Sequence, residues 1–271
     1  MANYNSRHTG AQIDNALLYQ ETLARTKLEH EIELAARIQS GILPRVQPHL
    51  AGLDIFGAAR SASLVGGDFF DHITRGTEEL GIVIGDVAGK GVSAALLMSM
   101  MLTTIRSAMR FMPMPLPGSV LRRVDQDLYD ELAQLGTFVT VFIGWYDARQ
   151  RLLKYANAGH APVIYVPANG KPELLIADGT AMGVIEHEQW QNHAIRFSAG
   201  DVLIAATDGF PEAHTDKDAM VGYDRLLRLA QQLAPLSARE IGEGFYRAVG
   251  EWTHGRAQDD DQTIIVIKGV P

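Results

Sequence analysis

Four short acidic signatures in this chain each lie beside an apolar stretch with the length and composition of a buried strand. They read Gly66-Gly67-Asp68-Phe69-Phe70-Asp71, Gly85-Asp86-Val87-Ala88-Gly89-Lys90-Gly91, Thr207-Asp208-Gly209 and Asp259-Asp260-Asp261-Gln262-Thr263. A carboxylate at the end of a buried strand loses hydration, and several that converge repel one another unless a cation lies between them. Oxygen donors alone suit hard divalent ions such as Mg²⁺ and Mn²⁺. The pattern therefore predicts a metal-dependent enzyme, and the ligand set favours phosphate chemistry.

The composition excludes several other classes of protein. The 271-residue chain has no cysteine, which rules out disulfides, cysteine nucleophiles and thiolate zinc sites. Its net charge of −8 argues against a nucleic-acid partner. The N-terminus lacks the apolar core of a signal peptide, and no apolar run reaches the ~18 residues that a membrane span requires. We therefore expect a cytoplasmic protein without a membrane span.

The N-terminal segment is predicted to form one long helix from about Gln12 to Leu43, which Pro44 ends. Its apolar residues recur at mostly helical spacings among charged ones: Leu17, Leu28, Ile32, Ala35, Ile38 and Ile42. So narrow a stripe on so long a helix predicts a coiled-coil dimer or a connector, with packing along its own domain as the alternative. Residues 12–19 also resemble the closing helix of GAF sensor domains. Residues 1–45 are thus expected to be a helical connector, and residues 46–271 a second domain.

Beyond Gly52 the sequence alternates between short strands and tight turns, with two pairs of helices. The predicted strands are Leu53–Ala59, Leu80–Gly85, Phe138–Tyr146, Leu152–Ala156, Pro162–Val166, Leu174–Ile176, Ala194–Phe197, Asp201–Ala206 and Thr263–Lys268. The predicted helices are Val92–Phe111, Gly118–Gln134, Tyr223–Ala234 and Ala238–Thr253. Clustered hairpins with segregated helix pairs indicate an α+β domain in which two packed, mainly antiparallel sheets lie between the helix pairs.

The aspartates are unequal candidates for metal ligands. Asp86 precedes a turn in which Gly89 and Gly91 permit close approach of a ligand, although Gly/Asp turns are also common as plain structure. Asp68 and Asp71 lie three residues apart and would point to opposite faces of a strand. Asp68 is the better ligand candidate, and Asp71 would support the ligands or belong to a turn.

Two further acidic positions flank predicted strands. Asp208 follows one strand, and Asp259, Asp260 and Asp261 precede the last one. Three adjacent carboxylates are costly without a nearby cation or full exposure, and an exposed loop is the simpler interpretation for Asp259.

Other polar residues carry weaker signals. Lys90 lacks the spacing of a phosphate-binding loop and is interpreted as a solvated charge. His160, in Asn157-Ala158-Gly159-His160, is more often structural in such a turn than a general acid or a metal ligand. Ser93 lies in no G-x-S-x-G elbow, so a serine hydrolase has no support.

Taken in order, the four signatures resemble those of the bacterial branch of the metal-dependent PPM serine/threonine protein phosphatases, the RsbU/SpoIIE-like enzymes. Four further segments match this family: Gln39-Ser40-Gly41-Ile42-Leu43-Pro44, Phe138-Val139-Thr140-Val141-Phe142, Asn157-Ala158-Gly159-His160 and Gly200-Asp201-Val202-Leu203. The resemblance runs from about Glu29 to Lys268. It implies an α-β-β-α sandwich with a two-metal centre in the cleft between the sheet edges.

The resemblance also implies roles for individual residues. Asp86 would bridge two Mn²⁺ or Mg²⁺ ions, with the backbone carbonyl of Val87 as a further ligand. The other ligands would be Asp68, Asp208 and Asp260, with Asp71 and Asp261 behind them. Asp260 is chosen because Asp260-Asp261-Gln262-Thr263 fits the D-D-x-T pattern of the family. A metal-bound water would attack phosphorus, so that Asp86 and Asp208 take part in catalysis through it.

The sequence departs from the wider family at one position. Eukaryotic members have Asp-Gly-His-Gly where this chain has Asp86-Val87-Ala88-Gly89, so Ala88 occupies the place of their candidate general acid. No confident match to their phosphate-binding arginine is found, and Arg60 is only a weak candidate for a phosphate contact. Slow turnover, or turnover that depends on an activating partner, would follow.

The resemblance implies a phosphoserine/phosphothreonine phosphatase that acts on a phosphorylated STAS-type anti-sigma-factor antagonist in a partner-switching pathway. It also implies an upstream sensor or activator and a homodimer formed through the N-terminal helix. One alternative is a metal-binding interaction module with little or no turnover, which the missing histidine favours. The other is a phosphohydrolase acting on a small phosphoester, which the absence of a recognisable base or ribose pocket disfavours.

Overall fold

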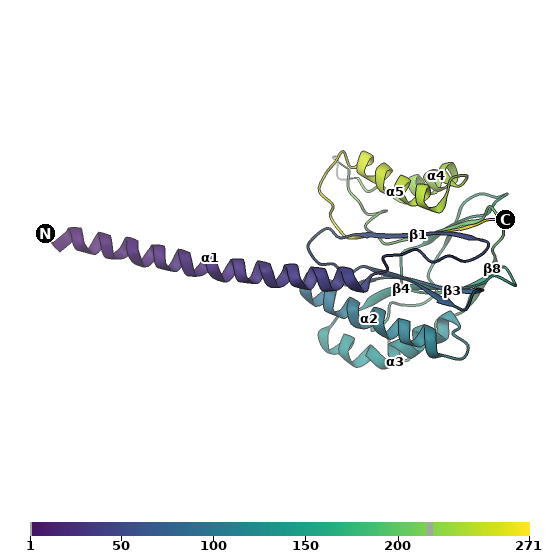
Figure 1. The fold of residues 1–271 in the computed structure, drawn as a ribbon, viewed down its shortest axis with the longest axis horizontal. Helices are drawn as coiled ribbons and strands as arrows, with labels where there is room; N and C mark the ends of the chain where they lie inside the picture. Colours follow the sequence, from purple (N-terminus) through teal and green to yellow (C-terminus); the bar gives the residue numbers. More distant parts are fainter. Residues whose placement is uncertain (1, 216–218) are drawn as a thin grey trace.

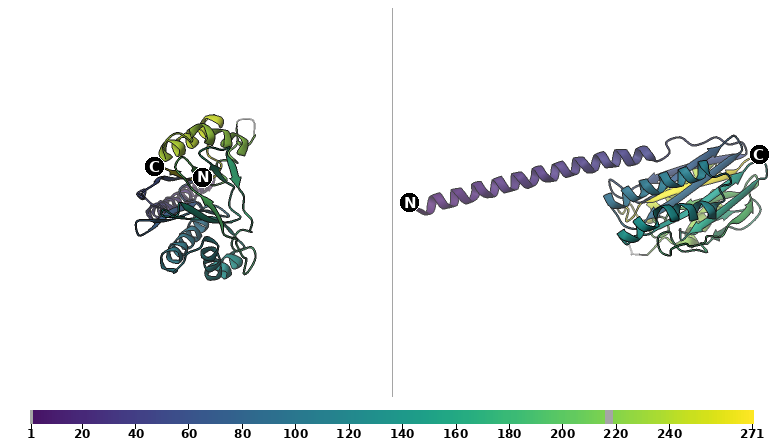
Figure 2. Two further views of the ribbon diagram at one scale, coloured as in Figure 1. Left: turned by 90° about the vertical axis from the view of Figure 1, so that its right-hand side faces the viewer. Right: turned by 90° about the horizontal axis from the view of Figure 1, so that it is seen from below.

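A computed structural model describes residues 2–215 and 219–271, with side chains from residue 17 onward in these ranges. Met1, the first residue of the predicted segment 1–45, lies outside the described residues. Two five-stranded sheets pack face to face, and a pair of helices covers each outer face (Figure 1). The end-on view in Figure 2 shows the same four layers stacked in the order helices, sheet, sheet, helices. The predicted α-β-β-α sandwich is therefore confirmed.

Each sheet is assembled from strands that are distant in the sequence. The first sheet has the order β1 (Leu53–Arg60), β10 (Gln262–Gly269), β9 (Val202–Ala206), β6 (Val163–Val166) and β7 (Glu173–Leu175). The second has the order β2 (Phe69–Arg75), β3 (Glu79–Val87), β4 (Val139–Asp147), β5 (Leu152–Ala158) and β8 (His193–Arg196). All neighbouring strands in both sheets are antiparallel.

The continuous apolar runs of the central strands follow from burial on both faces. In β3, Ile82 and Ile84 face the core between the two sheets, whereas Val83 faces the core beneath the helices. A third core joins the first sheet to its own helix pair and contains Phe210, Phe245 and the other buried residues of that layer.

The four domain helices lie close to where the sequence predicts them. Helices α2 (Val92–Phe111) and α3 (Pro117–Leu135) cover the second sheet, and α4 (Tyr223–Leu233) and α5 (Ala238–Trp252) cover the first (Figure 1). A capping box between Ser237 and Glu240 fixes the start of α5. Among the described helices, α2 alone has the length and apolar composition of a membrane span, but one of its faces is packed in the core of the second layer.

One strand was missed by the sequence analysis. Strand β2 follows Asp68 directly and contains Asp71 and His72 in its middle. Polar residues at these positions hide the alternation that marks a half-buried strand. Asp71 is buried because an arginine of α2 reaches it, and that arginine is distant in the sequence.

Helix α1 (Ala2–Ile42) projects away from the sandwich, and only its C-terminal part approaches α2 (Figures 1 and 2). Several of its apolar side chains are largely exposed in this single chain: Leu17, Leu18, Leu23, Leu28, Leu34 and Ile38.

Candidate metal centre

The strand registers bring the four acidic signatures to the same end of the sandwich. In the second sheet Phe69 pairs with Gly85, which places Asp68 beside Asp86. In the first sheet Ala206 pairs with Ile264, so the segment after β9 lies next to the segment before β10. Because the two sheets pack face to face, carboxylates from both meet at this end.

Asp68 is buried among other acidic groups. The residue is 6 % exposed, and its Oδ2 accepts a hydrogen bond of 2.8 Å from the hydroxyl of Thr207, which follows β9 of the opposite sheet. Burial, followed by repulsion from Asp86, raises the pKa of Asp68 well above its ordinary value. This carboxyl is therefore costly to ionise without a cation beside it.

Asp86 lies at the centre of the acidic cluster. Burial raises its pKa to about 7, and repulsion from Asp208, Asp260 and Asp261 adds to the shift. A hydrogen bond with Asp68 acts in the opposite direction. Carboxyl groups from both sheets thus act on Asp86, those of the first sheet by repulsion and Asp68 by a hydrogen bond.

Asp208 and Asp260 complete the cluster from the first sheet. Burial raises the pKa of Asp208, with further contributions from Glu212 and then Asp260. Asp260 forms an ion pair with Lys90, whose Nζ lies 3.0 Å from its Oδ2. Lys90 also donates a hydrogen bond of 2.9 Å to the carbonyl of Asp259, and its side chain is 67% exposed. It is thus a solvated charge, as the sequence predicts, that also pairs with the acidic segment.

Two glycines let the loop before β2 approach the ends of both sheets. A Cβ at Gly67 would lie 2.7 Å from the carbonyl oxygen of Val87 and 3.0 Å from Oδ1 of Asp86. A Cβ at Gly66 would overlap the carboxylate of Asp261. Only glycine leaves room here, so the Val87 carbonyl and the Asp86 carboxylate share a confined space.

Asp261 and Gln39 hold this loop in place. Asp261 is buried, and its Oδ1 accepts a hydrogen bond of 2.8 Å from the backbone N–H of Ala62. The side chain of Gln39, near the end of α1, donates to the carbonyl of Gly66 at 2.5 Å and accepts from the Gly66 N–H at 3.1 Å. The end of α1 is thereby tied to the loop that precedes Asp68.

Two cavities border Asp86. One, of about 260 Å³, is lined by the Gly66–Gly67 loop, Lys90 and Asp259–Asp261. The other, of about 360 Å³, is more apolar and is lined by Asp208, His160, Tyr223 and neighbouring residues. The acidic cluster is thus open on two sides.

His160 is held rigidly at the second cavity. Its backbone N–H donates to Asn157 Oδ1 at 2.7 Å, and its ring Nδ1 lies 3.0 Å from the hydroxyl of Thr140. Burial lowers the pKa of His160 to about 3, so the ring is neutral at physiological pH. A neutral ring is a hydrogen-bonding group and a poor general acid.

Two residues from the sequence analysis are not brought to this cluster. Asp71 points to the opposite face of the second sheet, where it forms an ion pair with Arg106 of α2. The guanidinium of Arg60 lies 3.9 Å above the ring of Tyr246 and lines a separate cavity of about 150 Å³ that does not include Asp86. Sequence reasoning placed Thr207 and Gln39 in matching segments but not their contacts, because Asp68 lies 139 residues from Thr207 and Gly66 lies 27 residues from Gln39.

The donor set of the cluster fits hard divalent cations. All the donors are oxygens, and Lys90 is the cation that pairs with them among the described residues. In the described part of the chain, no three His, Asp or Glu side chains are gathered closely enough around one point to hold an ion as they stand. Instead they surround the cavities beside Asp86, where their mutual repulsion is a cost that bound dications remove.

The sequence and fold place this chain among known proteins. The family model described as Stage II sporulation protein E (SpoIIE) matches residues 76–269. The phosphoserine phosphatase RsbU of Bacillus subtilis is 28% identical over 263 residues, which cover 94% of this chain and 76% of RsbU. Protein IcfG of Synechocystis is 26% identical over 94% of this chain, but the chain spans only 45% of the length of that relative.

Solved structures show the same fold. The SiaA-PP2C domain of Pseudomonas aeruginosa superposes with a TM-score of 0.81 at 24% identity, covering 90% of this chain and 98% of that one. The RsbU and RsbW domains of Rv1364c from Mycobacterium tuberculosis superpose with a TM-score of 0.70 at 24% identity, covering 82% and 61%. RsbX, solved in complex with magnesium, has a TM-score of 0.60 at 15% identity, covering 82% and 98%.

Proposed function

We propose that this chain, which belongs to the Stage II sporulation protein E (SpoIIE) family, is a metal-dependent serine/threonine protein phosphatase. Residues 46–271 would form the phosphatase domain and residues 1–45 the helical connector. The observation that carries this proposal is the convergence of carboxylates from both sheets on Asp86. Burial, followed by repulsion from Asp208, Asp260 and Asp261, raises the pKa of Asp86 to about 7, and among the described residues Lys90 is the cation that pairs with this cluster. Such a cluster is unfavourable unless it serves to bind cations.

The residues in this cluster would together hold two Mn²⁺ or Mg²⁺ ions. Asp86 would contact both, with the carbonyl of Val87 beside it, and Asp208 and Asp260 would approach from the first sheet. Asp68, held by Thr207, would complete the set. When bound, the cations would lower the pKa of water and offset charge on the phosphoryl oxygens. Asp261 would keep the Gly66–Gly67 loop in position through its hydrogen bond to Ala62.

The proposed substrate is a phosphoserine or phosphothreonine protein, of the STAS-type antagonist class, in a partner-switching pathway. Two relatives support the phosphoserine specificity, because RsbU and RsbP of Bacillus subtilis are both named phosphoserine phosphatases. The apolar cavity of about 360 Å³ beside Asp86 offers space for the residues that flank a phosphorylated side chain. We place this activity in the cytoplasm, downstream of a sensor or activator protein.

Phosphate release from a phosphoserine peptide and from a phosphorylated STAS protein tests the proposal. The assay would be run with Mn²⁺, with Mg²⁺ and with excess chelator, on the wild type, Asp208→Asn and Asp130→Asn. Asp130 is an exposed aspartate on α3, so its variant is a matched control. We expect metal-dependent release that Asp208→Asn abolishes and Asp130→Asn preserves. Release that ignores both chelator and Asp208→Asn would refute the proposed centre.

Two other results would favour the alternatives. Mn²⁺ binding by calorimetry without release from any substrate would indicate an interaction module or a chain that requires an activator. Release from a small phosphoester such as p-nitrophenyl phosphate, with none from either protein substrate, would indicate a small-molecule phosphohydrolase.

We also propose that α1 forms a homodimer and carries a signal from an upstream sensor. Leu28 is 57% exposed on a helix that projects from the sandwich, and burying such side chains in a partner helix would stabilise a dimer. Leu28→Asp combined with Ile32→Asp is expected to yield a monomer in sedimentation and to change activity, whereas Ile176→Asp, on an exposed site elsewhere, leaves both unchanged. Unchanged sedimentation and rate in the double variant would exclude this role for α1.

A further inference from the structure

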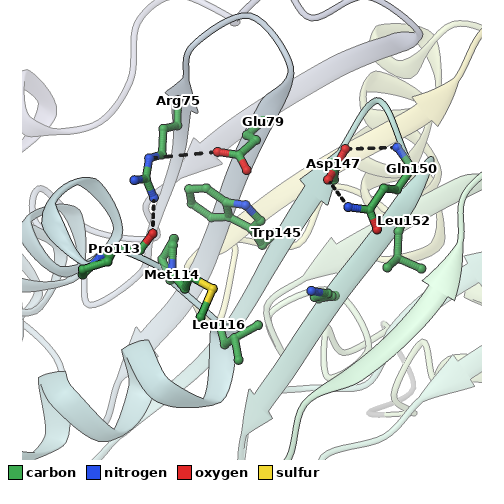
Figure 3. Close-up of a pocket in the computed structure, with 11 residues that line it drawn as sticks. Arg75, Glu79, Pro113, Met114, Leu116, Trp145, Asp147, Gln150 and Leu152 are labelled. Atoms are coloured by element: carbon green, nitrogen blue, oxygen red, sulfur yellow. Dashed lines mark hydrogen bonds and ion pairs between the residues drawn. The ribbon is translucent and has the colours of Figure 1, made fainter.

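A cavity of about 310 Å³ lies at the end of the second sheet opposite the acidic cluster. Figure 3 shows the residues that line it. It borders Glu79 at the start of β3, whereas Asp86 lies seven residues further along the same strand. An extended strand of that length spans about 23 Å. A molecule bound here therefore cannot contact the proposed metal centre.

The cavity has a flat apolar wall. Trp145 on β4 is 7% exposed and lies across Gly81 of β3, where a Cβ would come within 2.8 Å of the indole. Leu152 lies beside it on β5. Opposite the indole, the connector between α2 and α3 contributes Met114 and Leu116 (Figure 3). An indole face with a thioether opposite it suits a planar apolar group.

The connector is fixed in place by a charged residue of the sheet. The guanidinium of Arg75 donates hydrogen bonds of 3.2 and 3.3 Å to the carbonyls of Met112 and Pro113, and lies 4.0 Å from Glu79. Three prolines in residues 113–117 stiffen this segment. The cavity is thus held open by existing contacts.

Of the other two charged residues that line the cavity, Asp147 has hydrogen-bond partners within the described part of the chain and Lys154 has none there. Asp147 accepts two hydrogen bonds from Gln150, at 3.0 Å from its backbone N–H and 2.7 Å from its side-chain amide. Lys154 is directly opposite Trp145 in the β4–β5 register, so the two side chains lie on the same face of the sheet. Among the described residues, Lys154 has no ion-pair or hydrogen-bond partner for its side chain. The cavity therefore presents one unpaired cation beside an aromatic wall.

We propose that this cavity binds a small carboxylate with a planar apolar body, whose ring packs on Trp145 and whose carboxylate pairs with Lys154. A site so far from Asp86 suits an effector and not a substrate. The inference does not depend on the proposed phosphatase activity, because binding is measured without turnover.

Calorimetric titration of the full chain with 2-naphthoate, and with the neutral 2-naphthylmethanol as a matched probe, tests the inference. Naphthoate is expected to bind with one molecule per chain. The alcohol is expected to bind about tenfold more weakly, since a hydrogen bond to a charged group contributes about that factor. Lys154→Gln should weaken the binding of naphthoate by a similar factor and leave the binding of the alcohol unchanged. Lys171→Gln, an exposed lysine in the turn after β6, is the control and should match the wild type.

Two further readouts locate the site. In ¹⁵N-labelled protein the indole N–H resonance of Trp145 should shift on binding, while those of Trp190 and Trp252 stay in place. Met114→Ala, at a residue that is 78% exposed, should weaken both probes without unfolding the chain. Absence of binding at millimolar naphthoate, equal affinities of Lys154→Gln and Lys171→Gln, or a shift confined to Trp190 or Trp252 would each overturn the inference.

Discussion

Asp68 and Asp71 are both buried and lie three residues apart, but they reach opposite faces of the second sheet. On the face between the sheets, Asp68 meets Asp86 and the hydroxyl of Thr207, and no basic side chain pairs with it among the described residues. On the face beneath the helices, Asp71 forms an ion pair with Arg106 and accepts the N–H of His72. The comparison separates a carboxylate that supports the fold from one that the fold alone does not explain.

The largest effect on stability is expected from neutralising the paired carboxylate. Asp71→Asn would leave the guanidinium of Arg106 partly buried without a countercharge, which costs about 3 kcal/mol or more of unfolding free energy. Urea unfolding in the presence of chelator measures this loss. Asp71→Asn combined with Arg106→Met is the control, and it should recover part of the stability because both charges are removed. A loss of less than about 0.5 kcal/mol, the size of an ordinary surface substitution, would show that the pair is not structural.

The same substitution at the unpaired carboxylate is expected to have the opposite sign. In chelator at pH 8, Asp68→Asn should raise the unfolding free energy by about 1 kcal/mol, because it removes repulsion between Asp68 and Asp86. In saturating Mn²⁺ the wild type should be the more stable of the two. Its unfolding free energy rises by about 2.7 kcal/mol at a hundredfold excess of metal over its Kd, and that of the variant rises by less. A variant that loses stability in chelator would contradict the comparison, and would mean that Asp68 is needed as a charged partner within the fold.

The difference between the two aspartates shows what the sequence can and cannot reveal. Apolar runs such as Ile82-Val83-Ile84 and the helix Val92–Phe111 are determined by local patterning, and both were predicted almost to the residue. Strand β2 was missed because Asp71 interrupts the pattern, and its burial depends on Arg106, 35 residues away. The residues that flank Asp71 in the sequence do not indicate such a distant partner.

The candidate site was predictable to a similar extent. The placement of aspartates beside strand ends indicated that they would converge, and the registers of β2–β3 and β9–β10 bring them to the same end of the sandwich. The contacts of Lys90 and Gln39 were not predictable, because each joins segments that only the packing of the two sheets or of α1 brings together. Long-range packing decides these contacts.

A further effect is expected from pH alone. Because the folded-state pKa of Asp86 is raised from 3.8 to about 7, the folded chain binds this proton more tightly than the unfolded chain does. The corresponding stability is complete below about pH 4 and is lost as the pH rises through about 7. The Tm in chelator should therefore fall between pH 5 and pH 8 more steeply in the wild type than in Asp86→Asn. Mn²⁺ should restore the Tm at pH 8, with proton release on binding at pH 6. Parallel pH profiles for the wild type and Asp86→Asn would contradict the raised pKa of Asp86 in this buried acidic cluster.

The smallest effect is expected from Lys90, which pairs with Asp260 of the acidic cluster. Its ion pair with Asp260 is largely exposed, with side-chain exposures of 67% and 51%, so Lys90→Gln should change the unfolding free energy by less than about 1 kcal/mol. If Asp260 is a metal ligand, the ammonium group and the ion compete for its carboxylate. Lys90→Gln should then tighten Mn²⁺ binding by about threefold in calorimetry, within the range of one exposed charge pair. Lys171→Gln is the control for a lost surface charge. Weaker Mn²⁺ binding in Lys90→Gln would instead mean that Lys90 positions Asp260 for the metal, and the acidic cluster would then share with Asp71 its dependence on a basic partner.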